Sequence, residues 1–189
     1  MEALLTSTLV VALAEIGDKT QLLAILLAVQ FRKPLAIIAG IFAATIANHF
    51  LAALIGSQAA AFLEGDWFRY LIAASFLLMA AWTLIPDKLD EDERPRMRNG
   101  AFLTTLITFF LVEMGDKTQV ATIALGAQFE QVALVTLGTT VGMMLANVPA
   151  VYFGEAVIRR VPLSVVRRLA ALLFLALGIW LIAETAGWL

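Results

Sequence analysis

Residues 15–21 read EIGDKTQ, and residues 113–119 read EMGDKTQ. Each copy places three charged side chains within five positions, in a chain that is otherwise rich in aliphatic residues. The copies lie 98 residues apart, which indicates an internal repeat. The two stretches therefore decide how the rest of the chain is divided.

The composition is that of a membrane protein. Of the 189 residues, 61% are hydrophobic and 15% are charged, outside the usual range of soluble domains. The chain has no cysteine, which excludes disulfides and thiolate metal sites, and its one histidine, His49, cannot form a zinc centre alone. No basic patch with interleaved aromatic residues indicates a nucleic-acid partner. A bound metal ion would depend mainly on oxygen ligands.

The lengths of the apolar runs predict six spans in a lipid bilayer. Four runs are expected to cross a hydrocarbon core of about 30 Å by themselves or with interfacial residues at their ends: 35–63, 70–86, 132–154 and 169–183. Four shorter runs are too short to cross alone and are expected to pair as halves of two spans: 3–14 with 20–31, and 100–112 with 118–129. Both charged motifs then fall near the bilayer midplane. The predicted fold is an all-α integral membrane protein with six transmembrane helices.

The basic residues outside the motifs predict the orientation. With the N-terminus outside, ten of them fall on the inner side and only Arg69 falls on the outer side. The ten are Arg32, Lys33, Lys88, Arg94, Arg96, Arg98, Arg159, Arg160, Arg167 and Arg168. Both termini are therefore predicted to face outward. The charged connector, residues 87–99, is predicted to be a cytoplasmic solvated hinge, with an acidic sensor for cytosolic cations as the alternative.

The repeat extends well beyond the motifs. At the same offset the sequence pairs Thr6 with Thr104, Leu13 with Leu111, Gln30 with Gln128, Gly40 with Gly138, Gly56 with Gly154, Phe76 with Phe174 and Trp82 with Trp180, and after a slip of one residue Asn48 with Asn147. Each half holds three spans, an odd number, so the second half must enter the membrane from the opposite side. We predict two inverted three-helix repeats, residues 1–86 and 100–189, an arrangement typical of secondary transporters. The paired Phe and Trp residues are interpreted as scaffold.

Four carboxylates near the midplane require compensation: Glu15, Asp18, Glu113 and Asp116. An ionised carboxylate at this depth costs several kcal/mol unless it is paired, metal-bound or protonated. If each motif is helical, its Glu, Asp and Lys share one face of the helix. Lys19 and Lys117 are expected to balance two of the charges, and one divalent cation would balance the other two.

Neutral oxygen donors accompany the carboxylates. The further candidate metal ligands are Thr20, Thr118, Gln21, Gln119, Asn48 and Asn147, of which the two asparagines have an interhelical hydrogen bond as the alternative role. Such oxygens suit hard ions, for example Mn²⁺, Ca²⁺ and Mg²⁺. Without metal, desolvation and mutual repulsion favour proton uptake, so metal and protons are expected to compete for the site.

Three other residues are open to two interpretations each. His49 is assigned to packing or a local hydrogen bond in preference to a proton relay, because it has no counterpart in the repeat. Gly17 and Gly115 either break the motif helix or allow close packing, and the sequence does not separate these two roles.

Both motifs fit the signature E-x-G-D-[KR]-[ST], and the chain resembles the Gdt family of membrane cation transporters, which includes Golgi manganese and calcium transporters and bacterial manganese exporters. The resemblance covers the whole chain. It implies cation/proton exchange with the motif carboxylates in the transport path, which are Glu15, Asp18, Glu113 and Asp116 here, and Thr20 and Thr118 as secondary candidates. The chain lacks the long N-terminal extension of the Golgi members, so it looks like the compact bacterial form in a plasma membrane.

The predicted function is secondary-active transport of Mn²⁺ in exchange for protons, with export of Mn²⁺ from the cytosol. Ca²⁺ is the second candidate ion. No cofactor is expected, and a homo-oligomer is left open. The first alternative is an exporter of a small organic cation or an amino acid with the same architecture. A membrane enzyme is disfavoured because the motif offers no nucleophile with a base. An accessory subunit is disfavoured because no soluble domain is evident.

Overall fold

The computed structural model describes residues 1–63, 65–86, 100–154, 156 and 161–189, and its regular elements within these ranges are all helices. The elements are α1 Glu2–Glu15, α2 Lys19–Phe31, α3 Pro34–Phe62, α4 Asp66–Thr83, α5 Ala101–Glu113, α6 Lys117–Phe129, α7 Val132–Phe153 and α9 Leu163–Thr185. They lie on the apolar runs that the sequence predicted to be helical. The predicted connector, 87–99, is outside the described residues. The prediction of an all-helical chain is confirmed for the part described.

Each charged motif interrupts a helix. In the first, α1 ends at Glu15, Gly17 has a φ of +84°, and the extended Asp18 is the N-cap of α2. In the second, α5 ends at Glu113 and Gly115 has a φ of +81°. Positive φ values favour glycine, so the two glycines serve a helix break. The condition under which Glu, Asp and Lys would share one helical face is not met, because the motif is not helical between Glu and Lys.

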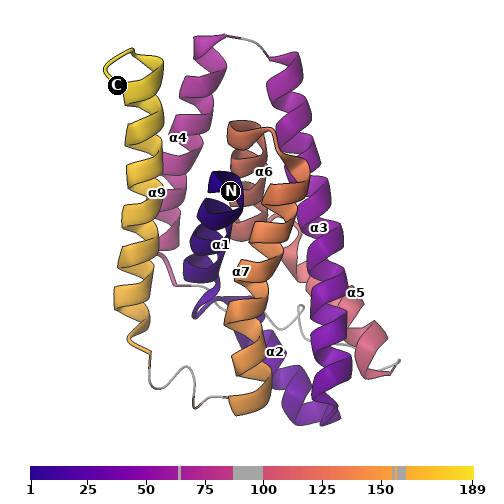
Figure 1. Ribbon diagram of the computed structural model, residues 1–189. Helices are drawn as coiled ribbons and strands as arrows, with labels where there is room; N and C mark the ends of the chain where they lie inside the picture. The colour runs from indigo at the N-terminus through magenta and orange to yellow at the C-terminus, as the bar shows by residue number, and fades with distance from the viewer. Residues whose placement is uncertain (64, 87–99, 155, 157–160) are drawn as a thin grey trace.

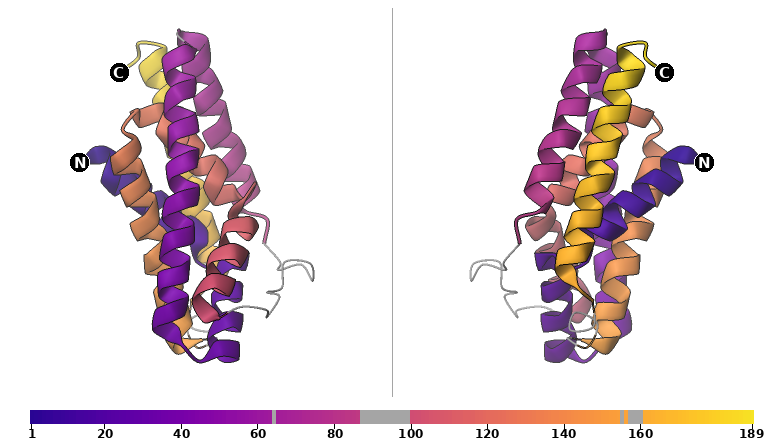
Figure 2. Two further views of the ribbon diagram at one scale, coloured as in Figure 1. Left: turned by 90° about the vertical axis from the view of Figure 1, so that its right-hand side faces the viewer. Right: turned by 90° about the vertical axis from the view of Figure 1, so that its left-hand side faces the viewer.

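Helices at equivalent places in the two halves run in opposite directions. In Figure 1, α1 and α2 run downward whereas α5 and α6 run upward, and α3 and α7 are likewise opposed, as are α4 and α9. The first helices pack across the halves, α1 against α7 and α5 against α3, and α4 packs against α9. Figure 2 shows that α3, α4 and α9 extend past the N-terminal end of α1.

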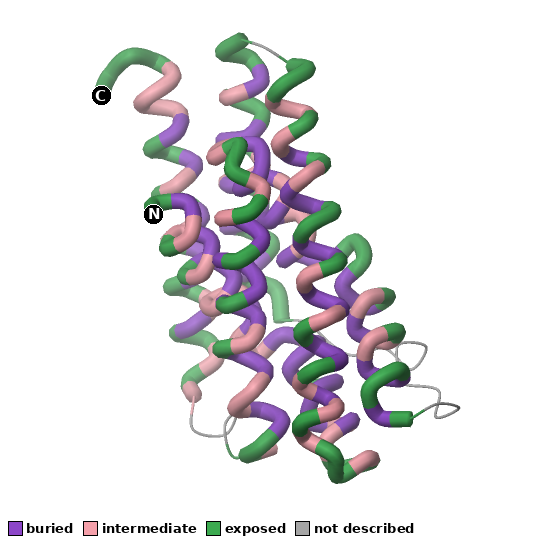
Figure 3. Tube along the Cα trace, turned by 45° about the vertical axis from the view of Figure 1, so that its right-hand side comes forward, coloured by how far each residue is buried: buried purple, intermediate pink, exposed green. Residues whose placement is uncertain are grey.

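Three of the described helices, α3, α7 and α9, are long and apolar enough to cross a membrane. Their outward faces carry large exposed apolar side chains, and the buried residues gather along the inside of the bundle (Figure 3). The helices α2 and α5 are apolar but shorter. This exposure pattern is the one expected of helices whose outer faces contact lipid.

Two glycines bring α3 and α6 into close contact. A Cβ atom on Gly126 would lie 2.5 Å from the carbonyl oxygen of Ala53 and 2.8 Å from its Cα. A Cβ on Gly56 would lie 2.7 Å from the backbone nitrogen of Ala127. Small residues at such crossings let membrane helices approach closely. The α6 half-helix is therefore fixed against a full-length helix of the other half.

Replacing Gly126 with Val is expected to lower the thermal stability of the purified protein. The new side chain meets backbone atoms of Ala53, which cannot rotate away, and overpacking of this kind typically costs about 1–3 kcal/mol. The control is Ala39→Val, which places the same side chain on an exposed position of α3. Thermal melting in detergent should show a clear decrease for Gly126→Val only. Equal midpoints for the two variants would contradict the predicted contact.

Candidate metal centre

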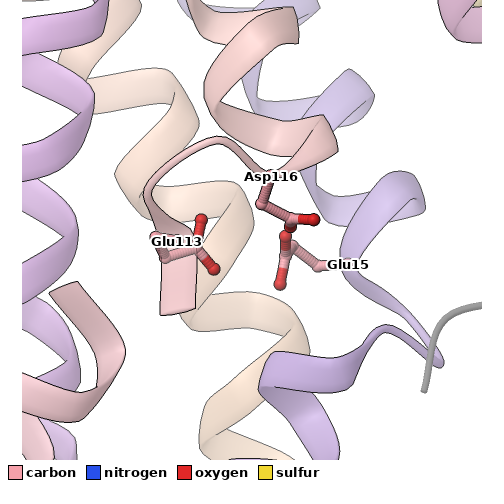
Figure 4. Close-up of side chains that lie close together, drawn as sticks. All are labelled: Glu15, Glu113 and Asp116. Atoms are coloured by element: carbon pink, nitrogen blue, oxygen red, sulfur yellow. The ribbon is translucent and has the colours of Figure 1, made fainter. Parts of the chain in front are cut away.

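Three carboxylates from the two motifs converge inside the bundle. Glu15, Glu113 and Asp116 each offer one oxygen, and these three oxygens lie within 4.8 Å of one another. Figure 4 shows the side chains pointing toward a common point, Glu15 from the end of α1 and the other two from either side of the second helix break. All three residues are buried. The two motifs, 98 residues apart in the sequence, thus contribute to a single group of acidic side chains.

Glu15 is held by hydroxyl groups of both motifs. The Thr20 hydroxyl donates to Glu15 Oε2 at 2.6 Å, and the Thr118 hydroxyl donates to Glu15 Oε1. Helix α2 therefore supplies one threonine and α6 the other. The Glu15 carboxylate is therefore held in position by hydrogen bonds from both motifs.

Glu113 has a different environment. Neither of its carboxylate oxygens has a hydrogen-bond partner among the described residues, although the residue is completely buried. Its carboxylate is close enough to Glu15, Asp116 and Asp18 to feel their negative charges, and to Lys19 to feel a positive one. Buried charged oxygens without a partner are rare, because each loses its hydration without compensation. Glu113 therefore has open coordination capacity that faces the acidic group.

The motif lysines make different contacts. The Lys19 ammonium lies 4.0 Å from Asp116 Oδ1, which joins the first motif to the second. The Lys117 ammonium donates to the backbone carbonyl of Ile85 at 2.8 Å and lies 5.8 Å from the ring centre of Trp82. The charge-balancing role expected of both lysines thus has a direct geometric counterpart at Lys19, and for Lys117 it stays a prediction.

Asp18 is the N-cap of α2 and lies outside the three-carboxylate group. One of its oxygens accepts from the backbone N–H of Thr20 at 3.4 Å. Its side chain is buried, and its charge reaches Glu113. The equivalent Asp116 is the N-cap of α6 and points into the group. The two aspartates of the repeat are therefore not in equivalent surroundings.

The candidate amide ligands join the helix breaks to the long helices. Gln21 accepts from the Gly17 N–H at 3.0 Å and donates to the Ala146 carbonyl at 2.9 Å, and Gln119 accepts from the Gly115 N–H at 2.7 Å and donates to Asn48. Asn48 also donates to the Phe110 carbonyl at 3.4 Å, which is the interhelical role expected as its alternative. Asn147 donates to the Met143 carbonyl of its own helix at 3.1 Å. Gln21, Gln119 and Asn48 thus link the interruptions to the long helices, and the role of all four amides as ligands stays a prediction.

His49 lies buried on α3, and neither ring nitrogen has a hydrogen-bond partner among the described residues. The local hydrogen bond offered as one of its roles is absent from this part of the structure, and its packing role stays a prediction. Trp82 and Ile85 were not expected near a motif, although the match of Trp82 with Trp180 in the repeat could have drawn attention to the first of them.

Comparison with known proteins gives this geometry a context. A family model described as "Divalent cation/proton antiporter GDT1" matches residues 3–91 and 101–188. The chain belongs to the GDT1 family. The resemblance predicted from the two motifs is therefore confirmed, and this GDT1 protein is an integral membrane protein of a cation transporter family.

Several GDT1 relatives align along most of this chain. A protein of Vibrio cholerae named "Putative manganese exporter" is 51% identical over 180 residues, which cover 95% of this chain and 90% of the relative. "GDT1-like protein 5" of Arabidopsis thaliana is 26% identical over 88% of this chain and 89% of its own length. A GDT1-like protein of Synechocystis is also 26% identical, over 100% of this chain and 98% of its own. No solved structure matches the chain.

Proposed function

We propose that this protein is a secondary-active transporter that exchanges Mn²⁺ for protons, with Ca²⁺ as a second transported ion. The observation that carries the proposal is the buried group of Glu15, Glu113 and Asp116, one from the first half of the chain and two from the second. Three carboxylates in a water-poor interior require cations, and one ammonium, that of Lys19, lies within ion-pair distance of Asp116. The remaining negative charge favours a divalent cation or protons.

The donor set supports a hard ion. We propose Glu15, Glu113 and Asp116 as the main ligands, with Asp18, the two motif threonines and the two motif glutamines in supporting places. Oxygen ligands of this kind suit Mn²⁺ and Ca²⁺, and the chain has no cysteine to attract softer ions. The name of the Vibrio cholerae relative agrees with manganese as the cargo.

The proposed architecture is six spans in two inverted repeats, with α1 and α2 as two halves of one span and α5 and α6 as two halves of another. The opposite directions of equivalent helices support it. So does the contact of equivalent residues with each other: the rings of Phe76 and Phe174 stack with centres 6.4 Å apart. Two such residues meet only near an axis that relates the halves.

A second pair of contacts supports the same symmetry. A Cβ on Gly40 would lie 2.8 Å from the Cβ of Thr105, and a Cβ on Gly138 would lie 2.9 Å from the Cβ of Ser7. Gly40 and Gly138 are 98 residues apart, and so are Ser7 and Thr105. The same contact between a first helix and the second helix of the other half thus occurs twice.

We further propose that the transporter resides in a bacterial plasma membrane with both termini outside, and that it exports its ion from the cytosol. Ten basic residues outside the motifs against one support this orientation, because positively charged residues collect on the cytoplasmic side. Two helix breaks at the interface of inverted halves are the usual place for a substrate in transporters that alternate between two open states.

Proton-coupled Mn²⁺ movement is the direct test of the function. A carboxylate must be deprotonated to bind metal, so proteoliposomes are expected to show Mn²⁺-dependent proton movement, and the apparent affinity for Mn²⁺ should fall as the pH falls. Mn²⁺ uptake and a pH-sensitive dye inside the vesicles measure the two fluxes. Choline and amino acids, added in place of Mn²⁺, test the alternative cargo. Proton movement with these organic solutes and none with Mn²⁺ or Ca²⁺ would reject the proposal.

A further inference from the structure

The C-terminal end of α4 holds the lysine of the second motif. The Lys117 ammonium donates to the Ile85 carbonyl at 2.8 Å and lies over the Trp82 ring, and both of these residues belong to the other half of the chain. A buried ammonium is costly, and a carbonyl oxygen together with an aromatic face compensates part of that cost. This contact fixes the end of α4 to the start of α6.

In the first motif, the residues equivalent to this contact lie in different surroundings. The counterparts of Lys117, Trp82 and Ile85 at the repeat offset are Lys19, Trp180 and Ala183. Lys19 lies 4.0 Å from Asp116, whereas Trp180 lines a small cavity of about 160 Å³ together with Glu2 and Thr6, at the beginning of α1. The end of α9 is thus remote from the first helix break, whereas the end of α4, its equivalent in the other half, contacts the second break.

The two helix breaks also differ in exposure. A Cβ on Gly17 would lie 2.7 Å from the side chain of Leu163, at the start of α9, whereas a Cβ on Gly115 would meet no atom within 4 Å. Met114, beside Gly115, is 57% exposed, and its counterpart Ile16 is partly buried. Interrupted backbone at membrane depth is tolerated only inside protein or beside water. The second break is therefore the more accessible of the two among the described residues, and exposed backbone of this kind at membrane depth is expected to face water.

The position of the α4–α9 pair explains why the two helix breaks differ in their contacts and exposure. Among the described residues α4 packs on α6 and α9 packs on α1, but neither has an extensive contact with the equivalent half-helices, α5 and α2. In Figure 1 the pair lies toward the end of the bundle that holds the C-terminus. If the halves exchanged conformations, α9 would move onto α2 and α4 onto α5, and the end of α9 would reach Lys19.

We propose that Trp82 and Ile85 are positioning residues that hold the α4–α9 pair in one state of the transport cycle through their contact with Lys117. In the opposite state, Trp180 and Ala183 hold the pair through an equivalent contact with Lys19. This inference rests on the proposed alternating-access function. It assigns transport roles to four residues outside the motifs. Trp82 and Trp180 then stabilise opposite states of the same conformational equilibrium.

The test compares Trp82→Leu with Trp180→Leu, the same change at equivalent positions. Because the chain has no cysteine, a single reporter can be introduced as Met114→Cys or, in a separate protein, as Ile16→Cys. The labelling rate of each reporter with a charged, membrane-impermeant maleimide measures how often that helix break is open to water. The ratio of the Met114→Cys rate to the Ile16→Cys rate then reports the equilibrium between the two states.

Trp82→Leu is expected to lower this ratio by about 2- to 30-fold, the range for loss of one cation–π contact. Trp180→Leu is expected to leave the ratio unchanged or to raise it. Lys117→Met, which keeps the apolar stem but removes the charge, should lower the ratio as Trp82→Leu does and replaces it if that variant does not fold. An unchanged ratio in both Trp82→Leu and Lys117→Met, or a decrease of equal size in Trp180→Leu, would overturn the proposal.

Mn²⁺ binding to the same proteins, measured by calorimetry, separates the two levels of inference. If the unmodified protein binds no Mn²⁺ and the ratio still shifts as expected, the proposed cargo fails and the positioning role stands. If Mn²⁺ binds to the unmodified protein and the ratio does not move in the variants, the positioning role fails and the proposed cargo stands.

Discussion

Glu113→Gln is expected to abolish Mn²⁺ transport without loss of the fold. The change removes the charge of a completely buried carboxylate whose oxygens have no hydrogen-bond partner among the described residues. Changes to groups that only support metal ligands typically reduce affinity or activity 10- to 100-fold, so loss of a ligand charge should lower transport by at least about 100-fold. Mn²⁺ uptake into proteoliposomes measures the effect.

The thermal stability of the Glu113→Gln protein, unlike its transport activity, should not decrease. The neutral amide removes repulsion from Glu15 and Asp116, so without metal the variant should melt no lower than the unmodified protein. Added Mn²⁺ should raise the melting temperature of the unmodified protein and have little effect on the variant, because a ligand stabilises only the state that binds it.

The control for Glu113→Gln is Glu184→Gln. Glu184 pairs with Arg69 at 3.0 Å, and both side chains are about two-fifths exposed. Exposed ion pairs contribute little, so this variant should transport Mn²⁺ at close to the normal rate. Normal transport by Glu113→Gln, or equal loss in the two variants, would remove Glu113 from the proposed site.

Asp116→Asn and Asp18→Asn should reduce transport unequally, although the two residues are equivalent in sequence. Asp116 is one of the three converging carboxylates and lies 4.0 Å from Lys19, so its replacement should lower transport by about 100-fold or more. Asp18 lies outside that group and caps α2, a role that asparagine also performs well. Its replacement should lower transport by only about tenfold, through the lost negative charge near Glu113.

Manganese tolerance of cells that express each variant, with membrane levels of the protein as the reference, measures this difference. Both variants should reach the membrane in normal amounts. A larger defect for Asp18→Asn than for Asp116→Asn would show that the working site differs from the three-carboxylate group. Equal and complete loss would indicate that both aspartates are ligands at some stage of the cycle.

The helices could be predicted from the sequence because their signal is local. Uncharged runs of sufficient length fold as helices in lipid, since every backbone polar group must be satisfied within its own segment. The short runs on either side of each motif could also be recognised as half-helices from length alone. Whether Gly17 and Gly115 break the helix could not be predicted, because glycine at a close helix contact has the same sequence pattern.

The site was predicted in part. The repeat identified four carboxylates, but Asp18 and Asp116 are identical in sequence context and differ in the structure. The same is true of Lys19 and Lys117. These differences come from tertiary contacts: Lys19 lies beside Asp116, whereas Lys117 lies beside Ile85 and Trp82, and residues within the motif do not encode such neighbours.

The sequence by itself determined the helical runs, the membrane setting, the family and the set of acidic residues, because each of these follows from residue type and spacing along the chain. Only the tertiary structure decided that Glu15, Glu113 and Asp116 meet, that Thr118 supports a carboxylate of the other half, and that Lys117 contacts Trp82 and Ile85. These contacts join segments far apart in the chain. Their geometry depends on how whole helices cross, and no local pattern encodes that.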